Sequence, residues 1–375
     1  MDRTAGQTPL VELGLDTFGD VTVDADGRRL TDAEVIRNVV EEAVLADRLG
    51  VDFIGVGEHH RDDFAVSSPE TVLAAIAGRT ERIRLGSAVT VLSSDDPVRV
   101  FQRFATLDAV SNGRAEVILG RGSFIESFPL FGYQLDQYEE LFEEKLDLFS
   151  VLLAEQPVTW SGETRAGLRN QQVYPRTAGG LTTWVGVGGS PQSVVRAAKY
   201  GLPLMIAIIG GESVRFAPFV DLYQRALTQF EHPQLPSHGD TPRKLGVSQA
   251  CRPRVGVHSP GHVAATDEQA KDELWPHWQR MRNKIGSERG WGPTTRAEFE
   301  HMASPDGALY VGSPDTVARK IAATVQTLQL SRFDMKYSAG TMPHEAMMSS
   351  IELYGGEVIP KVRELLATEA ATTGA

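Results

Sequence analysis

The run Glu58-His59-His60 contains the side chains of this chain that are most suited to chemistry. It follows residues 51–57, a mostly apolar run that predicts a buried strand. In α/β proteins, reacting groups usually lie at the C-terminal ends of parallel strands. An imidazole there can transfer protons near neutral pH or bind a metal ion, whereas a structural histidine would only hydrogen-bond at the strand end. Neighbouring residues on a strand face opposite sides, so a proton-transfer role for one histidine is easier than a shared metal.

A glycine-rich turn at residues 186–193 is the second candidate, because it joins a predicted strand to a predicted helix. Backbone N–H groups and hydroxyls at such a turn favour an anion such as phosphate, although simple helix capping explains the same residues. A near-copy at residues 312–315 has Asp315 in its first turn, where a carboxylate would repel phosphate. We therefore predict a phosphate cradle from Gly189, Ser190 and Ser193, and only a helix cap at the second copy.

Two further strand ends carry weaker signals. In Gly120-Arg121-Gly122, an arginine between glycines suits a bidentate contact with phosphate or carboxylate. An ion pair with an acid such as Glu126 is the simpler explanation. In Gly86-Ser87-Ala88-Val89, small residues at the end of a strand leave room for a flat ligand.

The composition narrows the class of protein. The chain has 375 residues and a formal charge of −12, which argues against a nucleic-acid partner because no broad basic face is expected. The single cysteine, Cys251, excludes an intramolecular disulfide, and we expect it to be buried and inert. Residues 1–9 lack the apolar core of a signal peptide, and no apolar run approaches a membrane span. A cytoplasmic protein without membrane contact is therefore expected.

The elements that must position these motifs alternate between strand and helix for most of the chain. The sequence predicts strands at residues 11–15, 51–57, 83–91, 115–119, 183–187, 204–208, within 247–258, and at 333–337. Amphipathic helices separate them, including 31–50, 97–110, 267–283 and 343–366. About eight such units favour a (β/α)8 TIM barrel with irregular insertions over a doubly wound sheet. We expect one domain at residues 1–366, a flexible tail at 367–375, and a lid or substrate wall at the irregular stretches 155–182 and 285–307.

The order of the motifs along the chain resembles the bacterial luciferase-like flavin-dependent monooxygenase family over nearly the whole length. The resemblance rests on Glu58-His59-His60, Gly86-Ser87-Ala88-Val89, Asp96-Pro97-Val98-Arg99, Ser111-Asn112-Gly113-Arg114, Gly120-Arg121-Gly122 and Gly189-Ser190-Pro191. It implies a TIM-barrel subunit, commonly a homodimer, that binds reduced FMN delivered by a separate NAD(P)H:flavin reductase. The reduced flavin and O2 would form a C4a-peroxyflavin that oxygenates a small organic substrate.

The resemblance also implies roles for single residues. His59 would act in the flavin chemistry and manage one proton with a pKa near neutral, while His60 would support it or contact the substrate. Arg121, Ser190 and Ser193 would bind the flavin phosphate. The remaining cofactor-binding set would be Glu58, Ala88, Val89, Gly120, Gly122, Gly188 and Gly189, with a cis peptide at Ala88-Val89 beneath the flavin ring.

Two departures from luciferase matter. Gly120 stands where luciferase has a reactive cysteine, and Gly189 stands where it has an acid. We therefore expect a non-luminous monooxygenase. The alternatives are an F420-dependent hydride-transfer enzyme on the same barrel, a non-catalytic flavin-binding protein, and a metal-dependent hydrolase. The last would use His59 and His60, with only His258 as an obvious further ligand, so we expect no metal.

Overall fold

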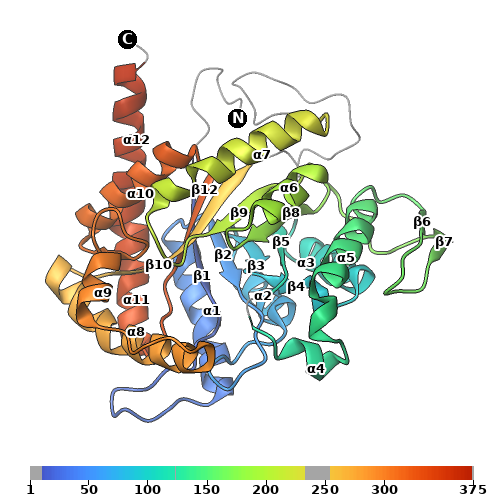
Figure 1. The fold of residues 1–375 in the computed structure, drawn as a ribbon. Helices are drawn as coiled ribbons and strands as arrows, with labels where there is room; N and C mark the ends of the chain where they lie inside the picture. The colour runs from blue at the N-terminus through green and yellow to red at the C-terminus, as the bar shows by residue number, and fades with distance from the viewer. Residues whose placement is uncertain (1–10, 123, 233–253, 374–375) are drawn as a thin grey trace.

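Eight parallel strands form a closed barrel in the computed structural model, which describes residues 11–122, 124–232 and 254–373 (Figure 1). Each strand pairs with the next, and the last pairs with the first. In spatial order the strands are β1 (Glu12–Thr17), β2 (Phe53–Val56), β3 (Arg84–Ser87), β5 (Ala115–Gly120), β8 (Thr182–Val187), β9 (Leu204–Ala207), β10 (Val255–Val263) and β12 (Arg332–Lys336). The predicted TIM-barrel fold is confirmed.

Helices cover the outside of the barrel and bury their apolar faces against the strands. A capping box begins the first of them, where the Thr31 and Glu34 side chains bond to each other's backbone amides. The helices that follow the barrel strands are α1 (Asp32–Arg48), α2 (Pro69–Ala77), α3 (Pro97–Val110), α5 (Tyr138–Leu152), α6 (Pro191–Lys199), α7 (Ala217–Gln229), α8 (Asp267–Arg289), α10 (Pro314–Leu328), α11 (His344–Leu353) and α12 (Ile359–Thr373).

The expected irregular stretch at 285–307 is partly wrong. Helix α8 continues past residue 283 and ends only at Gly290, whose left-handed φ of 71° suits a glycine C-cap. Gly286 lies inside the helix, where its Cβ position faces Trp291. A second helix, α9 (Arg296–Met302), occupies much of the rest. Gly286 therefore does not end the helix, although a glycine at this position suggested that it would.

Other boundaries also differ from expectation. The predicted strand at 83–91 is divided into β3 and β4 (Thr90–Val91), and α12 continues beyond the predicted end at residue 366. The stretch 155–182, expected to be irregular, contains an antiparallel hairpin, β6 (Val158–Trp160) with β7 (Leu168–Gln171). Short additions are α4 (Ser127–Phe131) and β11 (Tyr310–Gly312), which extends β10. The single-domain boundary at 366 stays a prediction.

Cys251, which we expected to be buried and inert, lies outside the described residues. Among the helices that the structure describes, none is long and apolar enough to cross a membrane.

The barrel interior changes from charged to apolar to open along the strands. Near their N-terminal ends, the buried Arg332 guanidinium donates to Glu116 at 2.7 Å. An apolar layer of Phe53, Ile118, Trp184 and Met205 follows. Beyond it the inward positions include Gly55 and Gly86, where a Cβ would lie 2.8 Å from Ala88 and 2.7 Å from Phe53. The close neighbours Ala88 and Phe53 therefore require glycine at these two positions.

Candidate active site

A cavity of about 340 Å³ lies at the C-terminal end of the barrel, which is within the size range of small-molecule sites. It is bounded by strand ends and by one face of α8. The predicted site residues that line it are Glu58, His59, Ala88, Val89, Gly120, Arg121, Gly122 and Gly188. His60, Gly189, Ser190 and Ser193 lie outside this lining.

His59 stands in a cage of aromatic rings. Its ring stacks on Phe64 at 4.3 Å and meets the edges of Phe18 at 4.7 Å and Phe124 at 5.2 Å. Burial lowers the pKa of His59 to about 3, because the charged imidazolium loses hydration there. The expected near-neutral pKa is therefore wrong. His59 is neutral at physiological pH and can donate or accept a hydrogen bond without carrying a transferable positive charge.

His60 is held away from the cavity by Glu58. The Glu58 carboxylate lies 3.0 Å from His60 Nε2 and also accepts from the Val91 amide at 2.9 Å. This carboxylate ties the end of β2 to β4, which fixes the wall between them. Within the described parts of the chain, no group of three or more His, Cys, Asp or Glu side chains is arranged to hold a metal ion.

The peptide between Ala88 and Val89 is cis, as the resemblance implied, and both residues line the cavity. The Val89 side chain packs over Gly120 and Gly186 on the neighbouring strands. A Cβ at Gly120 would lie 2.5 Å from Val89 Cγ2, so valine at one position requires glycine at the other. A cysteine at position 120 would meet the same contact.

Arg121 has an acidic partner other than the expected one. Its guanidinium pairs with Glu139 on α5 and lies 4.9 Å from the Tyr138 ring centroid. Glu126, the partner considered from the sequence, instead pairs with Arg61 at 2.5 Å. Since the Glu139 side chain is largely exposed, the Arg121 ion pair is open to exchange with a ligand anion.

The Ser190 turn caps α6. The Ser190 side chain accepts from the Ser193 amide at 3.3 Å, and the two hydroxyl oxygens lie 2.7 Å apart. Gly189 precedes them with a φ of 109°, which disfavours a side chain. The turn continues directly from Gly188, so it lies next to the cavity.

The near-copy of this turn, at residues 312–315, shows that such a turn can bind a carboxylate. There the Ser313 amide donates to Asp267 Oδ1 at 2.7 Å and the Thr316 hydroxyl donates to Oδ2 at 3.0 Å. An internal carboxylate thus occupies the anion position at the start of α10. At the Ser190 turn, no described carboxylate takes the equivalent place beside the Ser190 amide and Ser193 hydroxyl.

Sequence analysis did not identify Asp16 and Asp334, the two acidic residues that form the floor of the cavity. Asp16, at the end of β1, accepts from or donates to His258 Nδ1 at 2.7 Å, according to the protonation of the pair. Asp334 on β12 lies beside them, and burial raises its pKa well above the ordinary value, as does the nearby Asp16 charge. His258 was considered only as a metal ligand. Asp16 was missed because the strand was predicted to stop one residue earlier.

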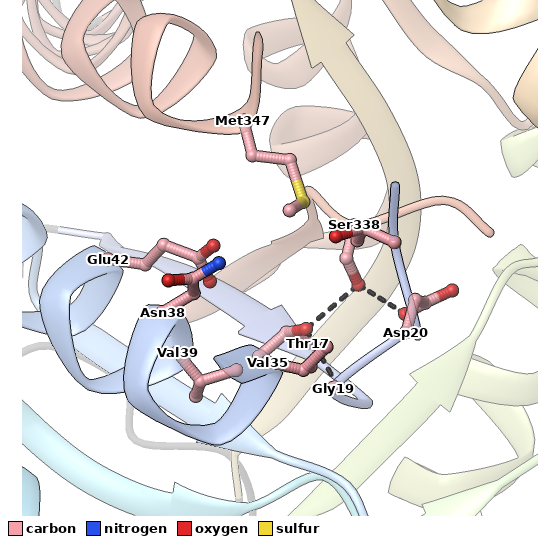
Figure 2. Close-up of a pocket in the computed structure, with 10 residues that line it drawn as sticks. Thr17, Gly19, Asp20, Val35, Asn38, Val39, Glu42, Ser338 and Met347 are labelled. Carbon is pink, nitrogen blue, oxygen red and sulfur yellow. Dashed lines mark hydrogen bonds between the residues drawn. The ribbon is translucent and has the colours of Figure 1, made fainter. Parts of the chain in front are cut away.

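A second, smaller cavity of about 10 Å³ lies behind this floor and is large enough for about one water molecule. Figure 2 shows Ser338 between Thr17 and Asp20. Thr17 donates to Ser338 at 2.9 Å, and Lys336 donates to Asp20 at 2.9 Å. Burial would raise the pKa of Asp20, but Lys336 and the hydrogen bonds from Ser338 and Gly340 lower it. This network fixes the end of β12 against β1.

Comparison with known proteins identifies the family of the chain. The model of the luciferase-like monooxygenases matches residues 17–331. The chain is 31% identical over 355 residues to 4-hydroxyprotoasukamycin monooxygenase from Streptomyces nodosus subsp. asukaensis, covering 89% of each.

Solved structures share the fold at lower identity. The oxygenating constituent of 3,6-diketocamphane monooxygenase from Pseudomonas putida, in complex with FMN, has a TM-score of 0.70 and 20% identity, covering 94% of this chain and 99% of its own. An F420-dependent secondary alcohol dehydrogenase has a TM-score of 0.68 and 15% identity, with 94% and 99% covered. Because the family model spans most of the sequence, the protein belongs to the luciferase-like monooxygenase family.

Proposed function

We propose that the protein is an FMN-dependent monooxygenase that uses reduced FMN and O2 to oxygenate a small organic substrate. The observation that carries this proposal is a mostly apolar cavity beside a serine turn at the start of α6, where no described carboxylate occupies the anion position. The FMN bound to the 3,6-diketocamphane monooxygenase component supports the choice of cofactor. We further propose a homodimer that receives reduced flavin from an NAD(P)H:flavin reductase.

The residues present fit FMN. The flat wall made by Ala88, Val89 and Gly120 suits one face of a planar ring system. Ser190 and Ser193 would bind the phosphate in the way that Ser313 and Thr316 bind the Asp267 carboxylate. Arg121 would exchange Glu139 for the phosphate and add a positive charge.

When bound, reduced FMN supplies two electrons and two protons, so that one atom of O2 enters the substrate and the other leaves as water. The chain must exclude bulk water from this reaction and hold the reactants. Phe18, Phe64 and Phe124 surround His59 and line the cavity with apolar surface, which disfavours bulk water there. The neutral His59 can orient a reactant by a hydrogen bond at a ring nitrogen.

Proton transfer is assigned to a different imidazole. The Asp16 carboxylate holds Nδ1 of His258 and fixes the ring, which lies parallel to Phe18 at 5.9 Å. The other ring nitrogen, Nε2, has no hydrogen-bond partner among the residues described, and His258 lines the cavity. A carboxylate that orients an imidazole in this way is a common arrangement for general acid–base catalysis. We assign the transferred proton to Nε2 of His258.

The proposal is tested with purified protein, an NADH:FMN reductase and a screen of small organic molecules. A true substrate should lower the hydrogen peroxide released for each O2 consumed, and ¹⁸O2 should place one labelled atom in the product. F420 supplied with its own reductant serves as the comparison. Turnover with reduced F420 and none with reduced FMN would replace the proposal by hydride transfer.

A further inference from the structure

One face of α8 forms a wall of the cavity. Trp278, Met281, Arg282, Ile285 and Arg289 all line it, at the three- and four-residue spacing that places side chains on one side of a helix. Figure 1 shows α8 lying across the end of the barrel where the strands terminate. The wall is therefore mostly apolar, with guanidinium groups within it.

Arg282 differs from the other arginines at this end of the barrel. Arg61 pairs with Asp63, Glu126 and Glu288, and Arg121 pairs with Glu139. No carboxylate in the described parts of the chain lies within ion-pair distance of Arg282. Its guanidinium lies 4.7 Å from the Trp291 ring centroid. Its Nε is buried without a hydrogen-bond partner.

A partly buried cation without a counter-ion is costly, and an anionic ligand would offset that cost. Burial lowers the pKa of Arg282, Glu298 raises it and Arg289 lowers it, so no internal group fully compensates for the lost hydration. The planar guanidinium, supported on one side by Trp291, suits a bidentate contact with a carboxylate.

The rest of the cavity limits where that anion can lie. Asp16 and Asp334 on the floor each have a buried carboxylate oxygen without a hydrogen-bond partner among the described residues. The Asp16 carboxylate opposes a second anion at depth. Phe124, Ile209 and Trp291 supply apolar surface between the floor and α8. An elongated ligand would thus place its charged end at α8 and its apolar end near His59 and His258.

We propose that the site takes an apolar substrate bearing one carboxylate or a comparable anionic group, which Arg282 binds against Trp291. This inference rests on the proposed oxygenase function for the reaction at the apolar end of the ligand. It names the substrate class, a lipophilic organic acid, and the residue that selects it.

The test compares 2-naphthoate with 2-naphthamide, which share size and shape but differ in charge, by calorimetric titration of the protein without flavin. The wild type should bind 2-naphthoate at least ~10-fold more tightly, as expected for a charge-assisted contact. Arg282→Met should abolish this preference, and Arg282→Lys should keep part of it because the charge remains. Arg280→Met is the matched control, since Arg280 is on the same helix but bonds to Thr341.

Equal affinity for the two probes in the wild type would overturn the inference, as would an undiminished preference in a folded Arg282→Met. Thermal melting shows that each variant is folded, and Arg282→Lys gives a second reading if the methionine variant is not. FMN titration of the wild type keeps the two proposals apart. A protein that binds FMN without charge preference loses only the inference, whereas one that prefers 2-naphthoate but does not bind FMN loses the proposed function.

Discussion

Nδ1 of His258 lies 2.7 Å from Oδ2 of Asp16, although the two residues are 242 positions apart in the sequence. Both line the cavity beside Phe18, whose ring separates His258 from His59. Burial lowers the pKa of His59 to about 3, and we propose that this pair has the proton function first expected of His59.

Replacing His258 with Gln should lower the oxygenation rate about 100-fold, the lower end of what general acid–base catalysis contributes. Asp16→Asn should produce a smaller loss, because the His258 ring loses the carboxylate that fixes its Nδ1. Product formation and peroxide release would be measured for each variant, with the exposed His301→Gln as the control. Full product formation in His258→Gln would remove the pair from proton transfer.

NMR of the flavin-free protein gives an independent reading of the same pair. The imidazole Cε1–H signal that disappears in His258→Gln identifies this residue. In Asp16→Asn the ring ¹⁵N shifts of this residue should change, because the carboxylate no longer contacts Nδ1 and fixes which ring nitrogen carries the proton. Unchanged ring ¹⁵N shifts would show that the 2.7 Å contact does not set the tautomer of His258.

His59 should make the protein less stable in mild acid. Its folded-state pKa of about 3 lies below the ordinary 6.5, so the unfolded chain binds more protons between these pH values. The free energy of unfolding should therefore fall as the pH is lowered from 6.5, by up to about 2 kcal/mol at pH 5 from this residue. His59→Gln should remove that slope in urea titrations at pH 7.5 and 5, whereas His301→Gln should retain it. Parallel slopes in all three proteins would contradict the low pKa.

The two copies of the serine turn give a matched pair of variants. Ser193→Ala should weaken FMN binding about 10-fold and riboflavin binding much less, because only FMN carries the phosphate. Thr316→Ala, at the copy that already binds Asp267, should leave FMN affinity unchanged. Flavin fluorescence titration measures both. Equal weakening of FMN and riboflavin by Ser193→Ala would place the phosphate elsewhere.

Val89 and Gly120 should behave as a coupled pair. Gly120→Ala places a Cβ 2.5 Å from Val89 Cγ2 and should lower the free energy of unfolding by about 1–3 kcal/mol. Val89→Ala combined with Gly120→Ala should recover most of that loss, because the clashing methyl groups are gone. Additive losses in a double-mutant cycle would show that the two positions are independent.

The sequence predicted the barrel and most of its strand-end motifs because alternating apolar strands and amphipathic helices are local signals. The aromatic cage of His59 was not predictable in the same way. Phe18 and Phe124 approach it from the ends of different strands, and their burial sets its pKa. Strand alternation would have predicted the inward orientation of Asp16 if the predicted strand had continued past residue 15. The helical extension of α8, which places Ile285 and Arg289 at the cavity, was hidden by Gly286.

Flavin binding at the end of the barrel is the central requirement of the proposed function, and anaerobic titration measures it without knowledge of the substrate. Reduced FMN, reduced riboflavin and reduced F420 would each be added to the wild-type protein and to Ser193→Ala. We predict saturable binding of reduced FMN that exceeds that of riboflavin, with the difference lost in Ser193→Ala. Tight binding of reduced F420 with none of reduced FMN would contradict the account.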